Sequence, residues 1–266
     1  MKKTLPPEPR VSPRILLIDI ETSPSLGYFF DLWKEGNIIE TVQEWYILSV
    51  GVKWLDEKRV SVFALPDFPL YLKDKHNDLN LMQKIHAFIS QADILVAHNG
   101  DQFDIKKINA RLIAHNLTPP PPNKTVDTLK AARRHFKFNS NKLDELGRYF
   151  KIGRKLAHTG KHLWLACIRG DPKAWKKMRA YNKQDVILLE KVYLKLRPWI
   201  ANHPNLNLYK KTTQFIHDAC PVCQSAHVWK RGFVITGTTR LVRRQRYECA
   251  KCHRWFQGVL LDKKKV

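Results

Sequence analysis

The sequence predicts an α/β protein in which helices flank one mixed β-sheet, followed by a small metal-binding module near the C-terminus. Short runs of β-branched and aliphatic residues, with amphipathic helical segments after them, predict the sheet and its helices. Two Cys-x-x-Cys pairs in basic surroundings predict the module. With 266 residues, of which 44% are hydrophobic, the chain can form one such core and a small appendage.

Three strands are expected before the first helix. The first lies in RILLIDIE (14–21), a short apolar run of the kind found in buried strands. Similar runs follow in WYILSVGVKW (45–54) and RVSVFAL (59–65), whereas the first helix is expected only near residues 79 to 91. Consecutive strands without a crossover helix favour antiparallel pairing, so we expect an antiparallel start to the mixed sheet.

A strand and its crossover helix are expected next. DILVAHN (93–99) has the pattern of a fourth buried strand, and FDIKKINARLIAHN (103–116) has that of a helix. The prolines from Pro119 to Pro122 cannot continue that helix. From Asp127 to about residue 165 the sequence is basic and helical or irregular, with SNKLDELGRYF (140–150) as an amphipathic segment. We expect this stretch to cover the sheet or to border a groove.

A long helix precedes a change in the character of the sequence. Asp171 can cap this helix, Pro172 suits its first turn, and Pro198 and Pro204 mark its end. Beyond residue 200 come paired cysteines, short β-like runs and many basic residues. The expected parts are a flexible basic N-terminus over 1–13, the α/β domain over 14–200, a linker over 201–216, the cysteine module over 217–260 and a basic tail over 261–266.

The balance of charge indicates a polyanionic partner. The chain has 47 Lys and Arg against 24 Asp and Glu, a formal net charge of +23. No apolar run approaches the length that spans a bilayer, and MKKTLPPEPR (1–10) has no apolar signal core. Five cysteines, four of them in Cys-x-x-Cys pairs, favour metal ligation over disulfides. We expect a soluble protein of a reducing, cytoplasmic compartment.

The first strand carries two carboxylates among apolar residues. Asp19 and Glu21 are two residues apart, so both side chains point to one face of the strand. Crowded like charges need compensation, and hard divalent ions such as Mg2+ or Mn2+ prefer oxygen ligands. The alternative is that the two acids end the strand and reach solvent.

Two further elements carry acids later in the chain. Asp104 follows the fourth strand in HNGDQFD (98–104), where it or Asp101 could instead cap the following helix. Tyr181 and Asp185 are four residues apart on the long helix, so a phenol and a carboxylate share one face. Taken alone, that spacing is also typical of packing and surface residues. The three elements in this order are far more specific than any one of them.

Together the three elements resemble the DEDD exonuclease superfamily, also called DnaQ-like, within the ribonuclease H-like fold. DIET (19–22), NGDQFD (99–104) and YNKQD (181–185) are similar to its first, second and third motifs. The tyrosine points to the DEDDy branch, and the second motif looks like that of family-B DNA polymerase proofreading domains and their stand-alone relatives. The resemblance spans roughly residues 14 to 200 and implies a metal-dependent 3'-5' exonuclease.

The resemblance also implies how the residues would act. Asp19 would bridge two Mg2+ or Mn2+ ions, Glu21 and Asp185 would complete the site that activates water, and Asp104 would serve the second ion. Tyr181 would position the attacking water, because a phenol with a pKa of about 10 is a poor base at neutral pH.

Substrate contacts are implied for a second set of residues. In this family the Asn of the second motif and the aromatic residue before its Asp lie near the substrate, and Asn99 and Phe103 hold those positions here. Phe103 could stack on the terminal base or wedge beside it. Thr22 and Leu26 would help to hold the terminal nucleotide.

The two Cys-x-x-Cys knuckles predict one structural Zn2+. CPVC and CAKC are separated by 25 residues and supply Cys220, Cys223, Cys249 and Cys252 as tetrahedral ligands. The module is too small for a convincing core, so the metal should contribute much of its folding free energy. Cys167 stands apart and is expected to be a small core residue. A mixed ligand set is the alternative, because three histidines lie near in sequence: His217, His227 and His253.

This module resembles the zinc ribbons of insertion-sequence transposases. We expect DNA contacts from four arginines that alternate with aromatic residues: Arg240, Arg243, Arg244 and Arg246. The alternative is that the aromatic residues form the ribbon's own core: Trp229, Phe233, Tyr247, Trp255 and Phe256.

Two alternatives to the exonuclease hypothesis stay open. A ribonuclease H-like fold with similar acids could cut internally as a structure-specific endonuclease, or it could be a non-catalytic nucleic-acid-binding factor. DNA is favoured over RNA because of the family-B-like motifs and the ribbon. No polymerase motif is apparent, so proofreading would need a separate polymerase. A role in DNA repair or recombination, or a phage origin, is equally open.

Overall fold

The computed structural model describes residues 12–30, 38–156, 160–209, 219–236 and 242–260. It divides into two compact units, one over Arg14–Tyr193 and one that contains Leu194 and the residues after it. The expected tail and nearly all of the expected N-terminal segment lie outside the described residues. Within the described part of the chain, no helix has the length and apolar character that crossing a bilayer requires.

A five-stranded sheet forms the centre of the first unit, in the order β5-β4-β1-β6-β7. Its strands are β1 (Ile15–Thr22), β4 (Ile47–Trp54), β5 (Ser61–Ala64), β6 (Ile94–Ala97) and β7 (Lys124–Asp127). β4 is antiparallel to both β1 and β5, whereas β6 is parallel to both β1 and β7. The predicted mixed sheet with an antiparallel start is therefore confirmed.

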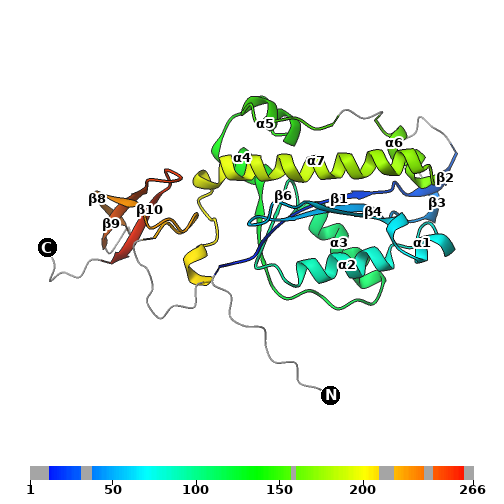
Figure 1. Ribbon diagram of the computed structural model, residues 1–266, viewed down its shortest axis with the longest axis horizontal. Coiled ribbons are helices and arrows are strands. Elements are labelled where there is room, and N and C mark those ends of the chain that lie inside the picture. The colour runs from blue at the N-terminus through cyan, green and yellow to red at the C-terminus, as the bar shows by residue number, and fades with distance from the viewer. Residues whose placement is uncertain (1–11, 31–37, 157–159, 210–218, 237–241, 261–266) are drawn as a thin grey trace, which may run out of the picture. The chain divides into compact units, whose positions relative to one another are not determined.

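Helices cover both faces of this sheet (Figure 1). α2 (Leu79–Ile89) and α3 (Asp104–Ala114) lie on one face, and α7 (Pro172–Leu196) runs along the other. The predicted cap of α7 is present, because the Asp171 carboxylate accepts a hydrogen bond from the Lys173 amide at 2.8 Å. The shorter helices are α1 (Leu70–Lys73), α4 (Thr128–His135), α5 (Leu143–Tyr149) and α6 (His162–Ile168).

The alternation of side chains along β1 decides which residues enter the core. Ile18 and Ile20 are almost fully buried and belong to one apolar cluster with Met82 of α2 and Ile108 of α3. The intervening positions of a strand point to its opposite face. Asp19 and the next acid on β1 therefore lie on the face that α7 covers.

α7 approaches the sheet closely at Gly51 of β4, which pairs with Asp19 of β1. A Cβ atom at Gly51 would lie 2.7 Å from Cγ2 of Val186 and 3.0 Å from the carbonyl oxygen of Asn182, both on α7. Because glycine has no side chain, the helix can rest on the sheet next to the Asp19 carboxylate.

Four elements of the first unit were not predicted: β2 (Leu26–Phe29), β3 (Ile38–Gln43), α1 and β7. A hairpin of β2 and β3 follows β1, and α1 precedes residue 79, so the expected run of three strands before the first helix was wrong. β2 and β3 pair only with each other and are largely exposed, so they lack the pattern of a buried strand. β7 has four residues, too few for a periodic signal.

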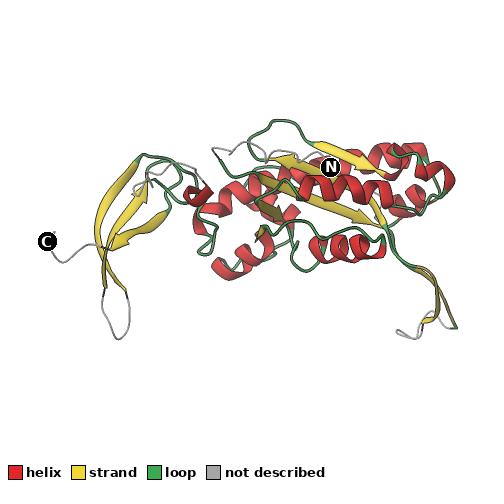
Figure 2. Cartoon of the chain, turned by 90° about the horizontal axis from the view of Figure 1, so that it is seen from below, coloured by secondary structure: helices red, strands yellow, loops and turns green. Residues whose placement is uncertain are grey.

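The second unit contains a three-stranded antiparallel sheet in the order β10-β9-β8 (Figure 2). Its strands are β8 (Val228–Thr236), β9 (Val242–Cys249) and β10 (Trp255–Leu260). Short 3-10 helices over Arg197–Trp199 and Leu206–Tyr209 precede them. The second lies in the expected linker, and its Leu206 amide donates to the Pro221 carbonyl at 2.7 Å. That part of the linker is therefore packed on the module, whereas residues 210–218 lie outside the described residues.

Candidate active site

Three carboxylates from β1 and α7 converge on the α7 side of the sheet. Oxygen atoms of Asp19, Glu21 and Asp185 all lie within 4.8 Å of one another. Strand alternation puts the first two side by side, and α7 brings the buried Asp185 against them. The structure thus unites three of the four predicted acids. The alternative that Asp19 and Glu21 merely reach solvent at the end of a strand does not hold.

Asp104, the fourth acid, lies beside this group at the start of α3. Its Oδ1 accepts a hydrogen bond from the Ile20 amide of β1 at 3.0 Å, which ties the helix to the strand between the two β1 acids. No side chain caps α3, so the capping alternative was wrong. Asp101, the other capping candidate, pairs with Lys130 at 2.7 Å. Burial raises the pKa of Asp104 to about 7.

Burial and crowding raise the pKa values of the β1 acids as well. Burial, reinforced by the charges of Glu21, Asp185 and Asp104, raises the pKa of Asp19 well above its usual value. Burial and the Asp185 charge raise the pKa of Glu21 to about 8. Hard divalent cations prefer such oxygen ligands, and their charge would relieve the repulsion. The residues present therefore fit the divalent metal that the sequence predicts.

Two side chains that sequence reasoning missed orient these acids. Asn182 of α7 donates from Nδ2 to Oδ2 of Asp19 at 2.6 Å and to the Asp19 carbonyl at 3.1 Å, and its Oδ1 accepts from Ser49 Oγ at 3.3 Å. The indole of Trp164 donates to Oε2 of Glu21 at 3.1 Å. Asn182 stands inside the YNKQD motif, which was the available signal. No pattern in the sequence connects Trp164 with Glu21.

Lys155 is a third residue that sequence reasoning missed. Its Nζ lies 2.5 Å from Oδ2 of Asp185 and 3.1 Å from the Tyr181 hydroxyl. Burial would lower the pKa of Lys155, but Asp185 and Asp19 hold it above its usual value, so the ammonium group is charged. The pKa of Tyr181 is raised by burial and then by the Asp185 charge. Its phenol therefore stays protonated at neutral pH.

The predicted substrate residues of this unit differ in how freely they can reach a ligand. Phe103, directly before α3, is 37% exposed, and Leu26 is 59% exposed. Thr22 is the partly buried last residue of β1. Asn99 has a left-handed backbone with φ 66°, and its amide donates to Oδ1 of Asp127 at 3.0 Å.

A cavity of about 630 Å³ has Lys155, the partner of Asp185, in its wall. Arg133 and Lys142 add two more basic groups against one acid, Asp144, so the wall is basic overall. Burial lowers the pKa of His98, which also lines the cavity, to about 4, so its ring is neutral. The basic stretch that begins at Asp127 thus borders a groove, as the sequence predicts.

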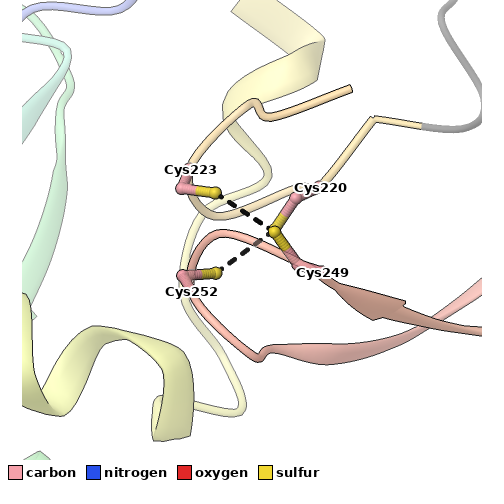
Figure 3. Close-up of side chains that lie close together, drawn as sticks. All are labelled: Cys220, Cys223, Cys249 and Cys252. Atoms are coloured by element: carbon pink, nitrogen blue, oxygen red, sulfur yellow. Dashed lines mark hydrogen bonds between the residues drawn. The ribbon is translucent and has the colours of Figure 1, made fainter. Parts of the chain in front are cut away.

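The four cysteines of the second unit also converge (Figure 3). Their sulfur atoms lie within 4.8 Å of one another, with Cys220 and Cys252 at 3.7 Å and Cys223 and Cys249 at 3.6 Å. A hydrogen bond from the Cys220 thiol lowers the pKa of Cys223 to about 4. Four thiol groups at this spacing can hold a tetrahedral ion such as Zn2+.

The remaining predicted ligands and core residue have simple positions. His227 and His253 are not part of the four-cysteine group, and His217 lies outside the described residues. Cys167 is fully buried in the first unit, which confirms the expectation that it is a small core residue.

The arginines and aromatic residues of the module divide between its interior and its surface. Arg240 lies outside the described residues. The other three arginines contact the module itself: Arg243 lies over the Phe233 ring, Arg244 donates to the Gly258 carbonyl, and Arg246 donates to the Arg231 carbonyl. Tyr247 and Phe256 stack in the interior with ring centroids 5.3 Å apart. The other three predicted core aromatics are exposed: Trp229, Phe233 and Trp255.

Part of the chain is similar to one protein family and to parts of two known polymerases. The sequence profile of the RNase H superfamily matches residues 28–197. A DNA polymerase III of the PolC type from Ureaplasma parvum serovar 3 is 27% identical over 138 residues, which is 50% of this chain and 10% of the polymerase. A solved family B DNA polymerase from the archaeon Pyrobaculum calidifontis has a TM-score of 0.49 and 16% identity, over 74% of this chain and 26% of that one.

The profile match extends over more than half of the chain and contains Asp104, Tyr181 and Asp185. Asp19 and Glu21 precede the matched range, but β1 holds them against the residues inside it. The mixed sheet with flanking helices agrees with the ribonuclease H-like fold. The chain therefore belongs to the RNase H superfamily.

Proposed function

We propose that this protein is a metal-dependent 3'-5' exonuclease that hydrolyses phosphodiester bonds of nucleic acid, with DNA as the favoured substrate. The observation that carries the proposal is the convergence of Asp19, Glu21 and Asp185 within 4.8 Å, with Asp104 beside them. Membership of a superfamily whose nucleases use divalent metals supports the chemistry. The similarity of one segment to a PolC-type DNA polymerase supports DNA as the substrate.

The four acids would hold two Mg2+ or Mn2+ ions, which supply the charge that activates water and stabilises the leaving oxygen. Hydrogen bonds to metal-ligating carboxylates fix their orientation and basicity. Asn182 does this for Asp19, and Trp164 does it for Glu21. Neither donor needs to touch the substrate to affect the rate.

Tyr181 and Lys155 supply two further functions at the same place. Tyr181 keeps its proton, so its hydroxyl positions the attacking water and does not act as a base. Lys155 presents a charged ammonium group both to Asp185 and to the cavity, where it would attract the phosphate of the terminal nucleotide. Phe103, partly exposed at the start of α3, would contact the terminal base.

The second unit is proposed to be a zinc ribbon that aids substrate binding. Its four cysteines would hold one structural Zn2+. Its strands carry exposed basic side chains such as Arg231 and Arg243, and the formal charge of the whole chain is +23. Both features favour a nucleic-acid ligand.

The test compares hydrolysis by the parent chain with that by Asp19→Asn, Asp104→Asn and Asp185→Asn on 3'-labelled and 5'-labelled oligonucleotides with Mg2+. Asp101→Asn is the matched control, because Asp101 lies in the same segment as Asp104 but pairs with Lys130. We expect stepwise shortening from the 3' end by the parent and by the control, and loss of hydrolysis in the three acid variants.

A circular single-stranded substrate separates exonucleolytic from internal cleavage. An exonuclease leaves the circle intact, whereas an endonuclease of the same fold opens it. Parental rates in Asp19→Asn or Asp185→Asn would refute the assignment of the acids, and binding without any metal-dependent product would identify a non-catalytic binding factor.

A further inference from the structure

A second cavity, of about 850 Å³, lies inside the second unit. It is bounded on one side by the residues around the Arg197–Trp199 turn and on the other by the loop from Lys251 to Trp255. Its charged lining residues are all basic, with Lys195, Arg197, Lys251 and Arg254 joined by His253. We refer to this cavity as the ribbon groove.

Arg254 holds the two sides of the ribbon groove together. Its Nη1 donates to the Pro198 carbonyl at 2.7 Å and its Nη2 donates to the Ala201 carbonyl at 3.4 Å. Its own carbonyl accepts from the Cys249 amide at 2.9 Å, which connects the groove to the cysteine cluster. The groove is therefore built by the folded module, and Arg254 serves as a structural link, while the exposed side chains of Lys195 and Lys251 can meet a ligand.

Two indole rings are exposed at the ribbon groove. Trp199 is 59% exposed and Trp255 is 48% exposed, although large aromatic side chains are usually more buried. The guanidinium of Arg246 lies 5.1 Å from the centre of the Trp255 ring and makes a cation–π contact with it. Flat rings beside basic groups, in a groove with no acidic lining residue, suit a ligand with both phosphates and exposed bases.

We propose that the ribbon groove binds a single-stranded segment of nucleic acid, with bases stacked on Trp199 and Trp255 and phosphates near Lys195 and Lys251. The proposal rests on the proposed nuclease function, since it names where that enzyme grips its substrate strand. It moves the expected grip away from Arg243, which lies over a ring of its own module. A duplex fits less well, because its bases are already stacked on one another.

Fluorescence anisotropy with labelled single-stranded oligothymidine, oligouridine and a DNA duplex tests this proposal on the full chain without added Mg2+, so that no substrate is consumed. Trp199→Ala and Trp255→Ala should each raise the Kd for a single strand about 10-fold or more, as expected for loss of one stacked base. Trp229→Ala is the matched control, because this indole is 46% exposed and lies near Arg231 in the same unit but does not line the groove. Its Kd should stay at the parental value.

Lys251→Ala is a further variant that tests the groove without a risk of misfolding. Lys251 is exposed in a loop, so its substitution removes one charge without disturbing the sheet. It should lower the dependence of log Kd on log salt by about one phosphate contact. The oligothymidine and oligouridine arms show whether the strand is DNA or RNA. The proposal is overturned if both tryptophan variants bind single strands like the parent, or if they weaken duplex binding to the same extent.

The failure of this proposal and that of the nuclease proposal are distinguishable. If the parent chain hydrolyses no substrate but Trp199→Ala binds single strands more weakly than the parent, the nuclease proposal is refuted and the proposed binding site in the ribbon groove stands. If the parent chain hydrolyses DNA but the Trp199→Ala and Trp255→Ala variants bind single strands as well as the parent, the nuclease proposal stands and the proposed binding site in the ribbon groove is refuted.

Discussion

The two clusters of candidate metal ligands stand on different amounts of packed core. Asp19 and Glu21 project from β1, whose neighbouring residues belong to a large apolar cluster shared by the sheet and its helices. In the second unit the four cysteines stand in a much smaller cluster, of which they are the larger part. Its buried cluster consists of Cys220, Val222 and Cys249, and the other two cysteines pack against it together with Val228 and Phe256.

This difference indicates opposite relations between metal and fold. In the first unit the core can hold like charges together, and the metal would relieve a strain that the fold already tolerates. In the second unit the apolar cluster around the cysteines is small, so the metal would supply much of the folding free energy of the three-stranded module. Loss of metal should therefore stop the chemistry at one cluster and unfold the structure at the other.

The largest effect is expected from Cys249→Ser, because structural zinc sites have apparent binding free energies of about 10–16 kcal/mol. Hydrogen exchange should show loss of protection in β8, β9 and β10, while β1 and β4 stay protected. Cys167→Ser is the control, since this buried thiol is not part of the four-cysteine group. Retained protection of the three strands in Cys249→Ser would remove the proposed contrast between the clusters.

Substitution of an acid should act on rate and leave the fold intact. Asp19→Asn should lower kcat by about 100-fold or more, the scale on which loss of one group that stabilises the transition state acts. Its free energy of unfolding without divalent metal should equal or exceed that of the parent, because one repelling charge is removed. Steady-state hydrolysis and chemical denaturation measure the two quantities. A destabilised Asp19→Asn protein would show that the acids are also structural.

A smaller effect is expected from the donors that orient the acids. Asn182→Ala removes the hydrogen bond to Oδ2 of Asp19 and should lower metal affinity or activity by about 10- to 100-fold. Part of this loss should be recovered at high Mn2+ concentration, which a general packing defect would not show. Asn80→Ala, whose side chain bonds only Gln83 on the surface of α2, serves as the control.

The smallest effect is a dependence of stability on pH. Without divalent metal, the folded state keeps protons on Glu21 up to about pH 8 and on Asp104 up to about pH 7, whereas the unfolded state loses them near 4.5 and 3.8. The unfolded state binds fewer protons across this window, so the free energy of unfolding should fall as pH rises.

Mg2+ should cancel most of this decrease, so the stabilisation by Mg2+ should grow from pH 5 to pH 8. Thermal unfolding in matched buffers measures it. A stabilisation by Mg2+ that does not change with pH would contradict the proposed link between the acids and the metal.

Elements with a strong buried pattern could be predicted from the sequence, and short or exposed ones could not. β1, β4 and β6 are apolar runs, and α7 has both an aspartate cap and a proline in its first turn. β2 and β3 lie outside the main sheet and face solvent, so tertiary pairing and not a buried face defines them. These two strands could be identified only from the folded structure.

Strand and helix periodicity puts Asp19 with Glu21 and Tyr181 with Asp185. The resemblance of the three ordered motifs to the DEDD exonucleases then predicted that these pairs meet Asp104. Lys155 could not be predicted, because its contact with Asp185 joins residues that are 30 positions apart and that no strand or helix period relates. The same holds for the ribbon groove. Trp199 was part of no predicted site, and Trp255 was predicted only as one of several aromatic residues among the arginines of the module; the folded module brings the two to one cavity.

Gly51 helps to set the spacing of the acid cluster, although it carries no charge and is not one of the candidate metal ligands. The distance between β1, which carries Asp19, and α7, which carries Asp185, depends on how closely α7 approaches Gly51. Because Gly51 has no Cβ atom, the backbone of its strand can touch the helix. A methyl group at this position would push α7 away from the sheet, and with it Asp185 away from Asp19. The spacing of the acid cluster thus depends on a residue without any functional group, on a strand that contributes none of the acids.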